Sequence, residues 1–551
     1  MISIKKIRIS NFKSIQFMDF LVTNEKTVFV GQNNAGKSNI NKAINCVFNP
    51  RYIPSEFDFY SGMKEDDVCY IDIMLIPNTD DKFDIDWLML FGENIVQNEY
   101  HQESFSIRTV ISQNHTSKRI EINRFPILNW ESQEFTDINR RLPKNLSKCI
   151  GSFYLDSSRD IVDELRIRNS NFSKLMKNSN YKLNELDSSN IERALEIVNR
   201  MIRKKLPSIS EIEDNLSEIS TTIENINELR IIPIPNKFDD LDKGVEIEVK
   251  NSNNNLPISV FGDGTRSWVS ILTLSSYIES TRKQLELENL PYFPIVLLEE
   301  PESHLHPQAQ NKVVSQLDKI SAQTFITTHS SNIVSELGIY QLFRVSNDES
   351  TQLQTVNKDI SQTDRYKIMN FILPFYTEIL FSNIVILVEG ISDKIIITEY
   401  LKMKLQKKPF ELGISIVATN SKDSLPLFRQ FCELHSIKNI IFADGDARDS
   451  VPNALQHKNL STCNLIFTKE LDMEYELIEE QLDFCSNAFA CMKALPSEYI
   501  DTLKKEDRLK NQVLTYFKGN KSQYPHYLAM KMDVNFNIRS LDLLISTLRR
   551  V

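Results

Sequence analysis

The sequence lacks the features of a secreted, zinc-stabilised or membrane-spanning protein. Its seven cysteines are scattered over 551 residues, with no C-x-x-C pair and no cysteine–histidine cluster. We therefore expect neither a disulfide framework nor a zinc site, and a reducing cytoplasm fits this pattern. No apolar run reaches the roughly 18 residues of a membrane span. Residues 1–9 alternate apolar with polar side chains and do not form the apolar core of a signal peptide.

An excess of positive charge is also missing. The chain has 64 Lys and Arg against 74 Asp and Glu, a formal net charge of -10, so as a whole it is not a basic coat for nucleic acid. A local basic face can still bind phosphates, and a metal-dependent nuclease needs clustered acids. The hydrophobic share of 41% and the charged share of 25% are those of a globular protein with packed cores. The length is enough for about three or four domains.

A short apolar run that ends on two acids organises the rest of the chain. Ile295–Leu298 is typical of a buried central strand in a parallel sheet, and Glu299, Glu300 and Pro301 follow it directly. In a nucleotide-hydrolysing sheet, one acid at this edge binds Mg²⁺ with a phosphate and the second polarises the attacking water. We expect Glu299 and Glu300 in these roles. An ordinary strand end with solvated acids is the alternative.

Glycine is scarce, with 13 residues, yet two glycines frame a phosphate-binding pattern near the amino terminus. The expected strand Thr27–Val30 runs into G-x-x-x-x-G-K-S at residues 31–38, and a helix follows. Loop N–H groups wrap the phosphate, Lys37 reaches the β- and γ-phosphate oxygens, and the hydroxyl of Ser38 can bind Mg²⁺. The expected nucleotide-binding residues of this loop are Gly31, Asn33, Asn34, Gly36, Lys37 and Ser38.

A helical insertion is expected between about residues 161 and 244. Apolar residues recur there at spacings of 4, 3, 4 and 3, which predicts the a/d seam of a short coiled coil. A helical hairpin of this kind suits packing on its copy in a dimer, and packing inside its own subunit is the alternative. The seam residues are Ile212, Leu216, Ile219, Ile223 and Ile226.

The chain then returns through an expected hairpin, Val245–Lys250 and Pro257–Phe261, to the segment G-D-G-T-R-S at residues 262–267. This segment opens an expected helix, Trp268–Ser280. Glycines, hydroxyls and a helix N-terminus together form an anion-binding site, and we expect Gly264 to belong to it.

The order of these motifs resembles the ABC/SMC-like ATPases: P-loop, inserted helices, G-D-G-T-R-S, L-L-E-E-P-E and then T-T-H-S at residues 327–330. The resemblance implies that Gly264 belongs to the signature that clamps a partner's γ-phosphate. It also implies that His329 is the switch histidine that reads the γ-phosphate. The sequence departs from the family in lacking LSGGQ and in having Glu299 where an aspartate is usual, and no Q-loop glutamine is identified. These departures concern the rate of hydrolysis more than nucleotide binding.

A second set of acids follows the strands of another parallel sheet. The expected strands are Ile384–Val388, Ile414–Ala418 and Asn439–Ala443. Glu389 follows the first strand, Asp444 and Asp446 follow the third, and Asp393 lies in the first turn of the helix from Ile391. At this edge of the sheet, the carboxylates would repel one another unless a cation were bound. All-oxygen ligands favour Mg²⁺ or Mn²⁺. A metal-free sheet edge is the alternative.

The pattern E-G-x-x-D followed by D-x-D resembles the Toprim fold of topoisomerases, primases and some nucleases. Glu474 offers a carboxylate for a second metal ion. Lys521 is our choice for the cation that steadies the transition-state phosphate, and Lys531 is the other candidate. A departure lies at Thr419-Asn420-Ser421, where the family commonly has a glycine.

An ABC-type ATPase followed by a Toprim domain resembles the OLD (overcoming lysogenization defect) family of nucleases over nearly the whole chain. The resemblance implies an α/β protein with a first ATPase part (1–160), a helical dimerisation insertion (161–244), a second ATPase part (245–375) and a Toprim domain with C-terminal helices (376–551). It implies ATP as cofactor and metal-dependent cleavage of DNA in anti-phage defence. It also implies a homodimer or higher even oligomer, with a partner protein or nucleic acid from the same defence system. The basic stretches Lys402–Lys408 and Lys504–Lys510 could contact the DNA backbone or, equally, be solvated helix faces.

The mechanism expected from these residues uses two metal ions at the Toprim site, besides one with ATP. Glu389, Asp444 and Asp446 hold the ion that activates water, with Glu389 also as general base, and the second ion near Asp393 and Glu474 stabilises the leaving oxygen. Hydrolysis of a phosphodiester needs no ATP energy, so ATP acts through conformation. One alternative is an SMC-like ATPase that clamps DNA without cleaving it. Another is topoisomerase-type strand passage, but none of the 17 tyrosines stands in a recognisable nucleophile context.

Overall fold

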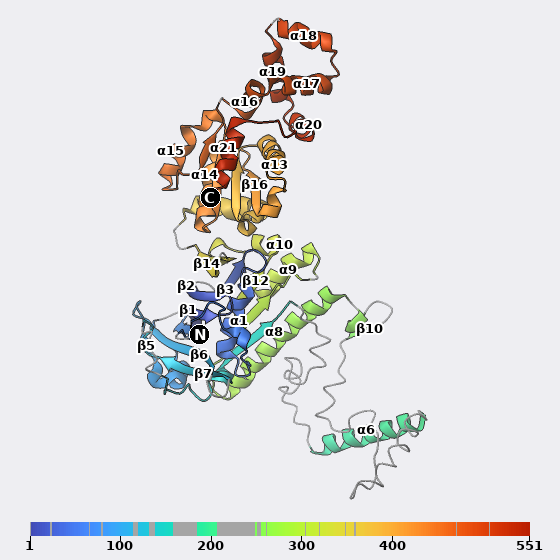
Figure 1. Cartoon of the computed structure of the whole chain (residues 1–551). Helices are drawn as coiled ribbons and strands as arrows, with labels where there is room; N and C mark the ends of the chain where they lie inside the picture. Colours follow the sequence, from blue (N-terminus) through green and yellow to red (C-terminus); the bar gives the residue numbers. More distant parts are fainter. Residues whose placement is uncertain are drawn as a thin grey trace.

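The structure is a computed structural model that describes residues 2–550 except 23–24, 65–66, 79–80, 114–118, 132–137, 158–184, 206–247, 251–254, 261, 304, 319, 348, 357–359, 470 and 506. The expected a/d seam at residues 212–226 lies outside the described residues, so dimerisation through it stays a prediction. Helix α6 (Glu185–Lys205) is described within the insertion and lies apart from the two sheets of the N-terminal part (Figure 1). No described helix is long and apolar enough to cross a membrane.

An antiparallel sheet forms one layer of the N-terminal part (Figure 1). Its strand order is β2-β1-β4-β6, and both β5 and β7 pair with β6. The first two strands pair antiparallel and are joined by a tight turn, from Phe12 to Ile15. The strands are β1 (Ile2–Phe12), β2 (Ile15–Leu21), β4 (Cys69–Pro77), β5 (Val96–Gln97), β6 (Glu103–Gln113) and β7 (Ile120–Ile127).

A second sheet carries the nucleotide motifs, in the order β14-β13-β3-β12-β11-β8. Every residue of β11 is buried, and its neighbours on both sides run parallel to it, which confirms the prediction of a buried central strand. Helix α1 (Lys37–Phe48) contacts strands of both sheets and fills the space between them. The strands are β3 (Lys26–Val30), β8 (Ile150–Leu155), β11 (Phe293–Glu299), β12 (Gln323–Thr328), β13 (Leu342–Asn347) and β14 (Thr351–Thr355).

The expected hairpin before β11 is present, but the predicted bounds of its second strand and of the helix after it were wrong. The hairpin pairs β9 (Glu248–Lys250) with β10 (Asn255–Pro257), and residues 258–260 form a 3-10 turn instead of continuing the strand. Pro257 has no N–H to extend the ladder, which explains why the strand ends there. Helix α8 (Asp263–Leu287) begins five residues earlier and ends seven residues later than Trp268–Ser280, so Gly264 lies inside its first turn.

The C-terminal part is built on a parallel sheet of order β16-β15-β17-β18. Strands β15 (Ile384–Val388) and β16 (Ile414–Ala418) have the predicted bounds, and β17 (Lys438–Ala443) begins one residue earlier. Strand β18 (Leu465–Phe467) was missed because three residues are too few to show a pattern. The helices are α13 (Ile391–Leu405), α14 (Leu425–Leu434), α15 (Ser450–His457), α16 (Met473–Glu480), α17 (Leu482–Lys493), α18 (Ser497–Lys505), α19 (Leu509–Gly519), α20 (Tyr524–Lys531) and α21 (Arg539–Leu548).

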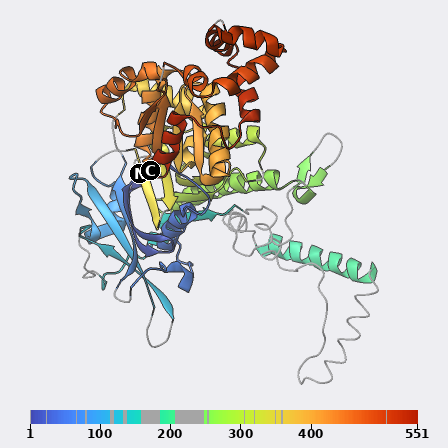
Figure 2. The same cartoon turned by 45° about the horizontal axis from the view of Figure 1, so that its top comes forward.

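One apolar core continues from the second sheet into the C-terminal sheet. Val28 of β3, Ile372 and Leu380 of the connecting segment, and Val385 of β15 belong to the same buried cluster. The connecting segment contains α11 (Gln362–Lys367), α12 (Leu373–Phe375) and a 3-10 turn, Thr377–Phe381. Figures 1 and 2 show the C-terminal sheet stacked directly on the N-terminal part. Because apolar residues fill the junction, it is a packed interface and not a loose linker.

Candidate active sites

The G-x-x-x-x-G-K-S segment forms a tight loop between β3 and α1, as its sequence predicts. Gly31 has φ +152° and Gly36 has φ +96°, and both are values that side-chain-bearing residues rarely adopt. A Cβ at Gly31 would collide with the carbonyl oxygen of Val345, and one at Gly36 would collide with the Thr351 hydroxyl. Both glycines are therefore required for the loop to pass this close to β13 and β14.

Lys37 lies inside this loop. Its Nζ donates to the carbonyl oxygens of Gly31 at 3.1 Å and Gln32 at 2.7 Å. Burial lowers the pKa of Lys37 to about 8, although the nearby carboxylates of Glu300 and Glu302 oppose this shift. The ammonium group thus remains charged at pH 7, and this buried cation, with the helix N-terminus behind it, fits a phosphate group.

Glu299 is the last residue of β11, and Glu300 follows it within electrostatic reach of Lys37. Glu299 accepts a hydrogen bond at its Oε1 from the hydroxyl of Tyr154 on β8, at 2.6 Å. Glu300 has a left-handed backbone with φ 43°, and its Oε1 lies 3.8 Å from Nε2 of His329. Burial, and then the positive charge of Lys37, lowers the pKa of His329. A histidine that is mostly neutral at pH 7, in contact with a carboxylate and within reach of the lysine charge, can respond to a phosphate bound nearby.

Glu302 is a functional candidate that sequence reasoning missed. Its Oε1 accepts from the hydroxyl of Thr328 at 2.7 Å and from the backbone N–H groups of His329 at 2.7 Å and Ser330 at 3.1 Å. Burial raises the pKa of Glu302. This one carboxylate therefore holds the strand end that carries His329. Its position after the proline in E-E-P-E was the only signal in the sequence.

Gly264 does not lie in the P-loop but in the first turn of α8, where the N-cap residue is Gly262. A role on the nucleotide of a partner copy stays a prediction.

The second set of acids surrounds a cavity of about 540 Å³ at the carboxyl ends of β15 and β17. Glu389, Asp393, Asp444 and Lys521 line it, so residues from three segments of the sequence meet there. Glu389 accepts at its Oε1 from the backbone N–H of Asp444 at 3.0 Å, which joins the two strand ends directly. Sequence reasoning missed Ser392 and His526, which also line the cavity.

The carboxylates of this cavity destabilise one another's charged forms. Burial, and then the negative charges of Asp393 and Glu389, raises the pKa of Asp444 to about 8. Burial raises the pKa of Asp393 to about 7, against a hydrogen bond from the Gly390 N–H and with a contribution from the charge of Glu474. Burial also raises the pKa of Glu389. Such acids bind protons when no other cation neutralises them.

Two of the predicted ligands are held by lysines at the edge of this cavity. Asp446 is half exposed, does not line the cavity, and pairs through Oδ2 with Nζ of Lys422 at 2.9 Å. Glu474 is buried, and its Oε1 lies 3.1 Å from Nζ of Lys521. Lys531, the other candidate for the catalytic lysine, is the last residue of α20 and does not line the cavity.

The donor chemistry of the cavity fits a hard divalent cation. Its acids offer only oxygen ligands, and their raised pKa values mean that positive charge is favoured among them. In the described part of the chain, no three His, Cys, Asp or Glu side chains form a ready group of metal ligands. Metal binding therefore requires rotation of these side chains, and Asp446 must leave Lys422 if it takes part.

The departure at Thr419-Asn420-Ser421 has a local explanation. Asn420 has φ 64°, so it adopts the left-handed conformation that a glycine would adopt in this loop. Asparagine tolerates this region better than most residues. Its Nδ2 donates to the hydroxyl of Tyr376 at 3.2 Å, and Asn420 and Ser421 both line the acidic cavity.

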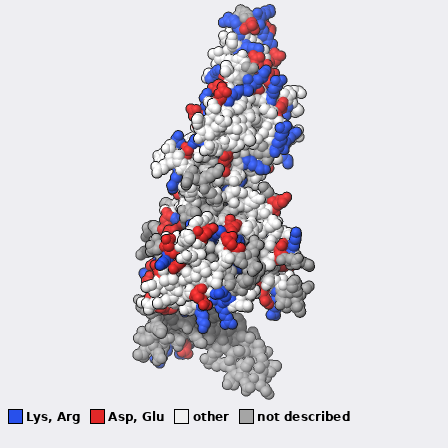
Figure 3. All heavy atoms as spheres, turned by 90° about the vertical axis from the view of Figure 1, so that its left-hand side faces the viewer, with Lys and Arg blue, Asp and Glu red and all other residues white. Residues whose placement is uncertain are grey.

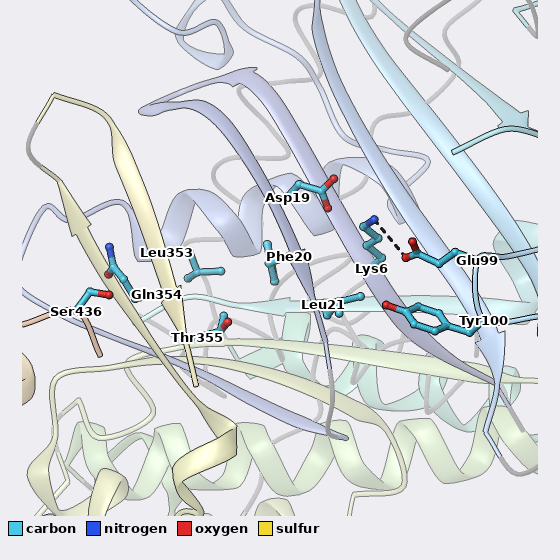
Figure 4. A pocket seen from close by; sticks show the side chains of 10 residues that line it. All are labelled: Lys6, Asp19, Phe20, Leu21, Glu99, Tyr100, Leu353, Gln354, Thr355 and Ser436. Atoms are coloured by element: carbon cyan, nitrogen blue, oxygen red, sulfur yellow. Dashed lines mark ion pairs between the residues drawn. The ribbon is translucent and has the colours of Figure 1, made fainter. Parts of the chain in front are cut away.

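A further cavity, of about 570 Å³, lies between the antiparallel sheet and β14 (Figure 4). Lys6 and Glu99 form an ion pair of 3.7 Å on one side of it, and Gln354 and Ser436 lie on the other. None of the predicted site residues lines this cavity.

The two basic stretches carry neighbouring acids. Lys402 pairs with Glu399 at 2.8 Å, Lys504 with Asp483 at 3.1 Å, and Lys510 with Glu479 at 3.0 Å. Acidic and basic side chains are interspersed over the upper, C-terminal part of the face in Figure 3. This arrangement favours solvated helix faces over a continuous DNA track.

Family comparisons agree with this division of the chain into two sites. Residues 2–334 match the family described as an AAA ATPase domain. Residues 380–446 match the Toprim domain of proteins like the overcoming lysogenization defect protein.

Relatives of this chain include named nucleases. The Old nuclease of Escherichia phage P2 is 24% identical over 85% of this chain and 81% of its own length. The OLD nuclease of Thermus scotoductus is 22% identical over 80% of this chain and 82% of its own length. Endonuclease GajA of Bacillus cereus is 23% identical over 68% of this chain and 64% of its own length.

Solved structures that resemble this one include an Smc head domain from Pyrococcus furiosus, 16% identical over 68% of this chain and 100% of that chain, with a TM-score of 0.36. Another is the C-terminal region of the Burkholderia pseudomallei OLD protein, 14% identical over 31% of this chain and 98% of that chain, with a TM-score of 0.26.

The ATPase family match covers more than half of the chain, an OLD-like Toprim match follows it, and OLD nucleases are among the relatives. The chain therefore belongs to the OLD family, in which an ATPase domain precedes a Toprim domain.

Proposed function

We propose that this protein is an ATP-regulated, divalent-metal-dependent endonuclease that nicks or cleaves DNA, and that it serves in anti-phage defence. The observation that carries the proposal is the acidic cavity, where Glu389, Asp393 and Asp444 face Lys521. The names of its relatives, two OLD nucleases and an endonuclease, support the same activity. Mg²⁺ or Mn²⁺ is the proposed cofactor of this site, and ATP with Mg²⁺ is that of the P-loop.

At the acidic cavity, a bound divalent cation would supply an activated water and charge stabilisation for the leaving oxygen. The Glu389 carboxylate accepts from the backbone N–H of Asp444, and the Asp444 carboxylate accepts from the backbone N–H of Met473, so both acids are held at the ends of their strands. Lys521 carries the positive charge that attracts the scissile phosphate. Glu389 remains the candidate general base, because its raised pKa gives it a useful affinity for the proton of water.

At the P-loop, we assign Lys37 to the β- and γ-phosphates, Ser38 and Glu299 to Mg²⁺, and Glu300 to the attacking water. Tyr154 orients Glu299, and Glu302 holds the backbone of His329. This arrangement supports binding of a nucleoside triphosphate and sensing of its γ-phosphate by His329.

The two sites are connected by the short segment Tyr376–Phe381. At one end, the Phe381 carbonyl oxygen accepts from Nε2 of Gln32 in the P-loop at 3.0 Å, and the Phe381 ring lies 6.3 Å from the ring of His329. At the other end, the Tyr376 hydroxyl accepts from Asn420 at the rim of the acidic cavity. A change at the γ-phosphate therefore has a short, packed route to the nuclease site, which supports regulation by ATP.

The testing experiment incubates the protein with supercoiled plasmid and Mg²⁺ or Mn²⁺, with and without ATP. Relaxed or linear product that requires the metal and is abolished in both Glu389→Ala and Asp444→Ala is the expected result. The matched control is Asp364→Ala, which removes an acid outside both sites whose partner is Lys458. Wild-type and Glu389→Ala proteins that leave the plasmid equally intact, while retarding it in gels, would instead favour a DNA clamp.

The topoisomerase alternative finds no support in Tyr524, the tyrosine that bonds Glu474. Tyr524 is fully buried and donates its hydroxyl hydrogen to Glu474, so its oxygen is not presented to a DNA strand. A homodimer or higher even oligomer, and a partner from the same defence system, remain part of the proposal through family membership.

A further inference from the structure

Tyr524 bonds Glu474 but does not line the acidic cavity, and it has no role in the reaction as described so far. It is the first residue of α20, its side chain is fully buried, and its ring stacks on Phe517 with centroids 4.5 Å apart. Its hydroxyl donates to Oε1 of Glu474 at 3.0 Å. Because α20 packs along α13, the helix that begins beside Glu389, the ring is fixed relative to the floor of the cavity.

Glu474 therefore receives two donors at one oxygen. Lys521 Nζ lies 3.1 Å from the same Oε1, and Glu474 is only 2% exposed. A carboxylate oxygen has two lone pairs, so these two donors use Oε1 fully and leave Oε2 for another positive partner. The charge of Glu474 acts on Asp393 and Asp444, which places it within electrostatic reach of both acids.

We propose that Tyr524 is a positioning residue that holds the Glu474 carboxylate so that its free oxygen completes the second cation site beside Asp393. This inference rests on the proposed nuclease function, since it assigns the geometry of the same site. The hydroxyl is suited to the task because, unlike Lys521, it is neutral and buried. Lys521 is 57% exposed at its side chain and can leave Glu474 for a phosphate, whereas Tyr524 cannot move without opening the core.

The test uses Tyr524→Phe, which keeps the ring and its stacking and removes only the hydroxyl. Mn²⁺ binding is measured by calorimetry and by the electron paramagnetic resonance of free Mn²⁺, in the absence of DNA and nucleotide. We expect the weaker class of Mn²⁺ sites to lose about 10- to 100-fold in affinity, the usual effect of removing a group that orients a metal ligand. Plasmid cleavage is expected to need correspondingly more Mn²⁺ and to recover at high concentration.

The matched control is Tyr527→Phe, on the same helix and one turn further along, where the hydroxyl faces Cys491 and not Glu474. It should bind Mn²⁺ as wild type does. A positioning role also requires that Tyr524→Phe add nothing to Glu474→Ala, because the hydroxyl acts only through that carboxylate. Should Tyr524→Phe fail to fold, Glu474→Gln keeps an oxygen that accepts from Tyr524 and removes the charge. It must weaken the same Mn²⁺ site.

Wild-type Mn²⁺ affinity in folded Tyr524→Phe or in Glu474→Gln would overturn the inference. A wild-type protein that binds Mn²⁺ but leaves DNA intact would refute the nuclease proposal alone, since the Mn²⁺ titration still decides the role of Tyr524. A wild-type protein that binds no Mn²⁺ would overturn both.

Discussion

The side chain of Gln32 donates a hydrogen bond from Nε2 to the carbonyl oxygen of Phe381 at 3.0 Å, across 349 positions of the sequence. Gln32 belongs to the P-loop, and Phe381 ends the turn that leads into β15, the strand that precedes Glu389. Arg344 of β13 donates to the carbonyl oxygens of Leu380 and Ser382 on either side. The turn is thus held by the P-loop through one hydrogen bond and by β13 through two.

Gln32→Ala is expected to weaken communication between ATP and the nuclease site. The loss of one neutral hydrogen bond corresponds to about 1 kcal/mol, or about fivefold in the ratio of cleavage rates with and without ATP. Cleavage without ATP and ATP affinity should stay near wild type, because Lys37 contacts the backbone oxygen of Gln32 and not its side chain. The control is Gln102→Ala, whose side chain bonds Asp81 on the surface. An unchanged ATP response in Gln32→Ala would refute communication between the two sites through the Gln32 side chain.

Glu302→Ala is expected to impair ATP hydrolysis through His329. The substitution removes the acceptor shared by Thr328, His329 and Ser330, and it should also lower the free energy of unfolding by about 1–3 kcal/mol. ATP turnover is measured beside His329→Ala and the double variant. If Glu302 acts by holding His329, the double variant is no slower than His329→Ala, and additive losses would contradict the idea.

Asp444 makes the metal-free protein less stable at higher pH. Its pKa rises from 3.8 unfolded to about 8 folded, so between these values the native state binds more protons than the unfolded state. The free energy of unfolding therefore falls as pH rises through this window. We expect Asp444→Asn to stabilise the EDTA-treated protein at pH 8 by on the order of 2 kcal/mol, and by less at pH 5. Denaturant unfolding at the two pH values checks this, and an Asn variant that is less stable at pH 8 would contradict it.

The buried ion pair of Asp72 and Arg108 in the antiparallel sheet should contribute far more to the free energy of unfolding than the surface ion pairs do. Arg108 Nε lies 2.8 Å from Asp72 Oδ1 and both side chains have zero exposure. Removing one partner strands a buried charge, so Asp72→Ala is expected to lower the free energy of unfolding by about 3–5 kcal/mol. Asp483→Ala, which breaks the exposed pair with Lys504, should cost less than about 1 kcal/mol. Similar losses in the two variants would argue against this difference.

The sequence alone determined the elements and the acids that end them. Buried parallel strands are continuous apolar runs, so β15 and β16 were predicted residue for residue, and Glu389, Asp444 and Glu299 followed as strand-end acids. The P-loop could also be predicted from local sequence, because its two glycines and its lysine lie within one short loop. The short strand β18 and the start of α8 had too little local pattern to be predicted correctly.

Only the tertiary structure decided which distant side chains meet. Glu474 and Tyr524 are 50 residues apart, Lys422 and Asp446 are 24 apart, and Gln32 and Phe381 are 349 apart. Such contacts depend on how helices dock on a sheet and how the two parts share a core, and neither is encoded in the periodicity of a single segment. The same docking set the raised pKa values of Asp393 and Asp444, because burial and neighbouring charge exist only after the chain has folded.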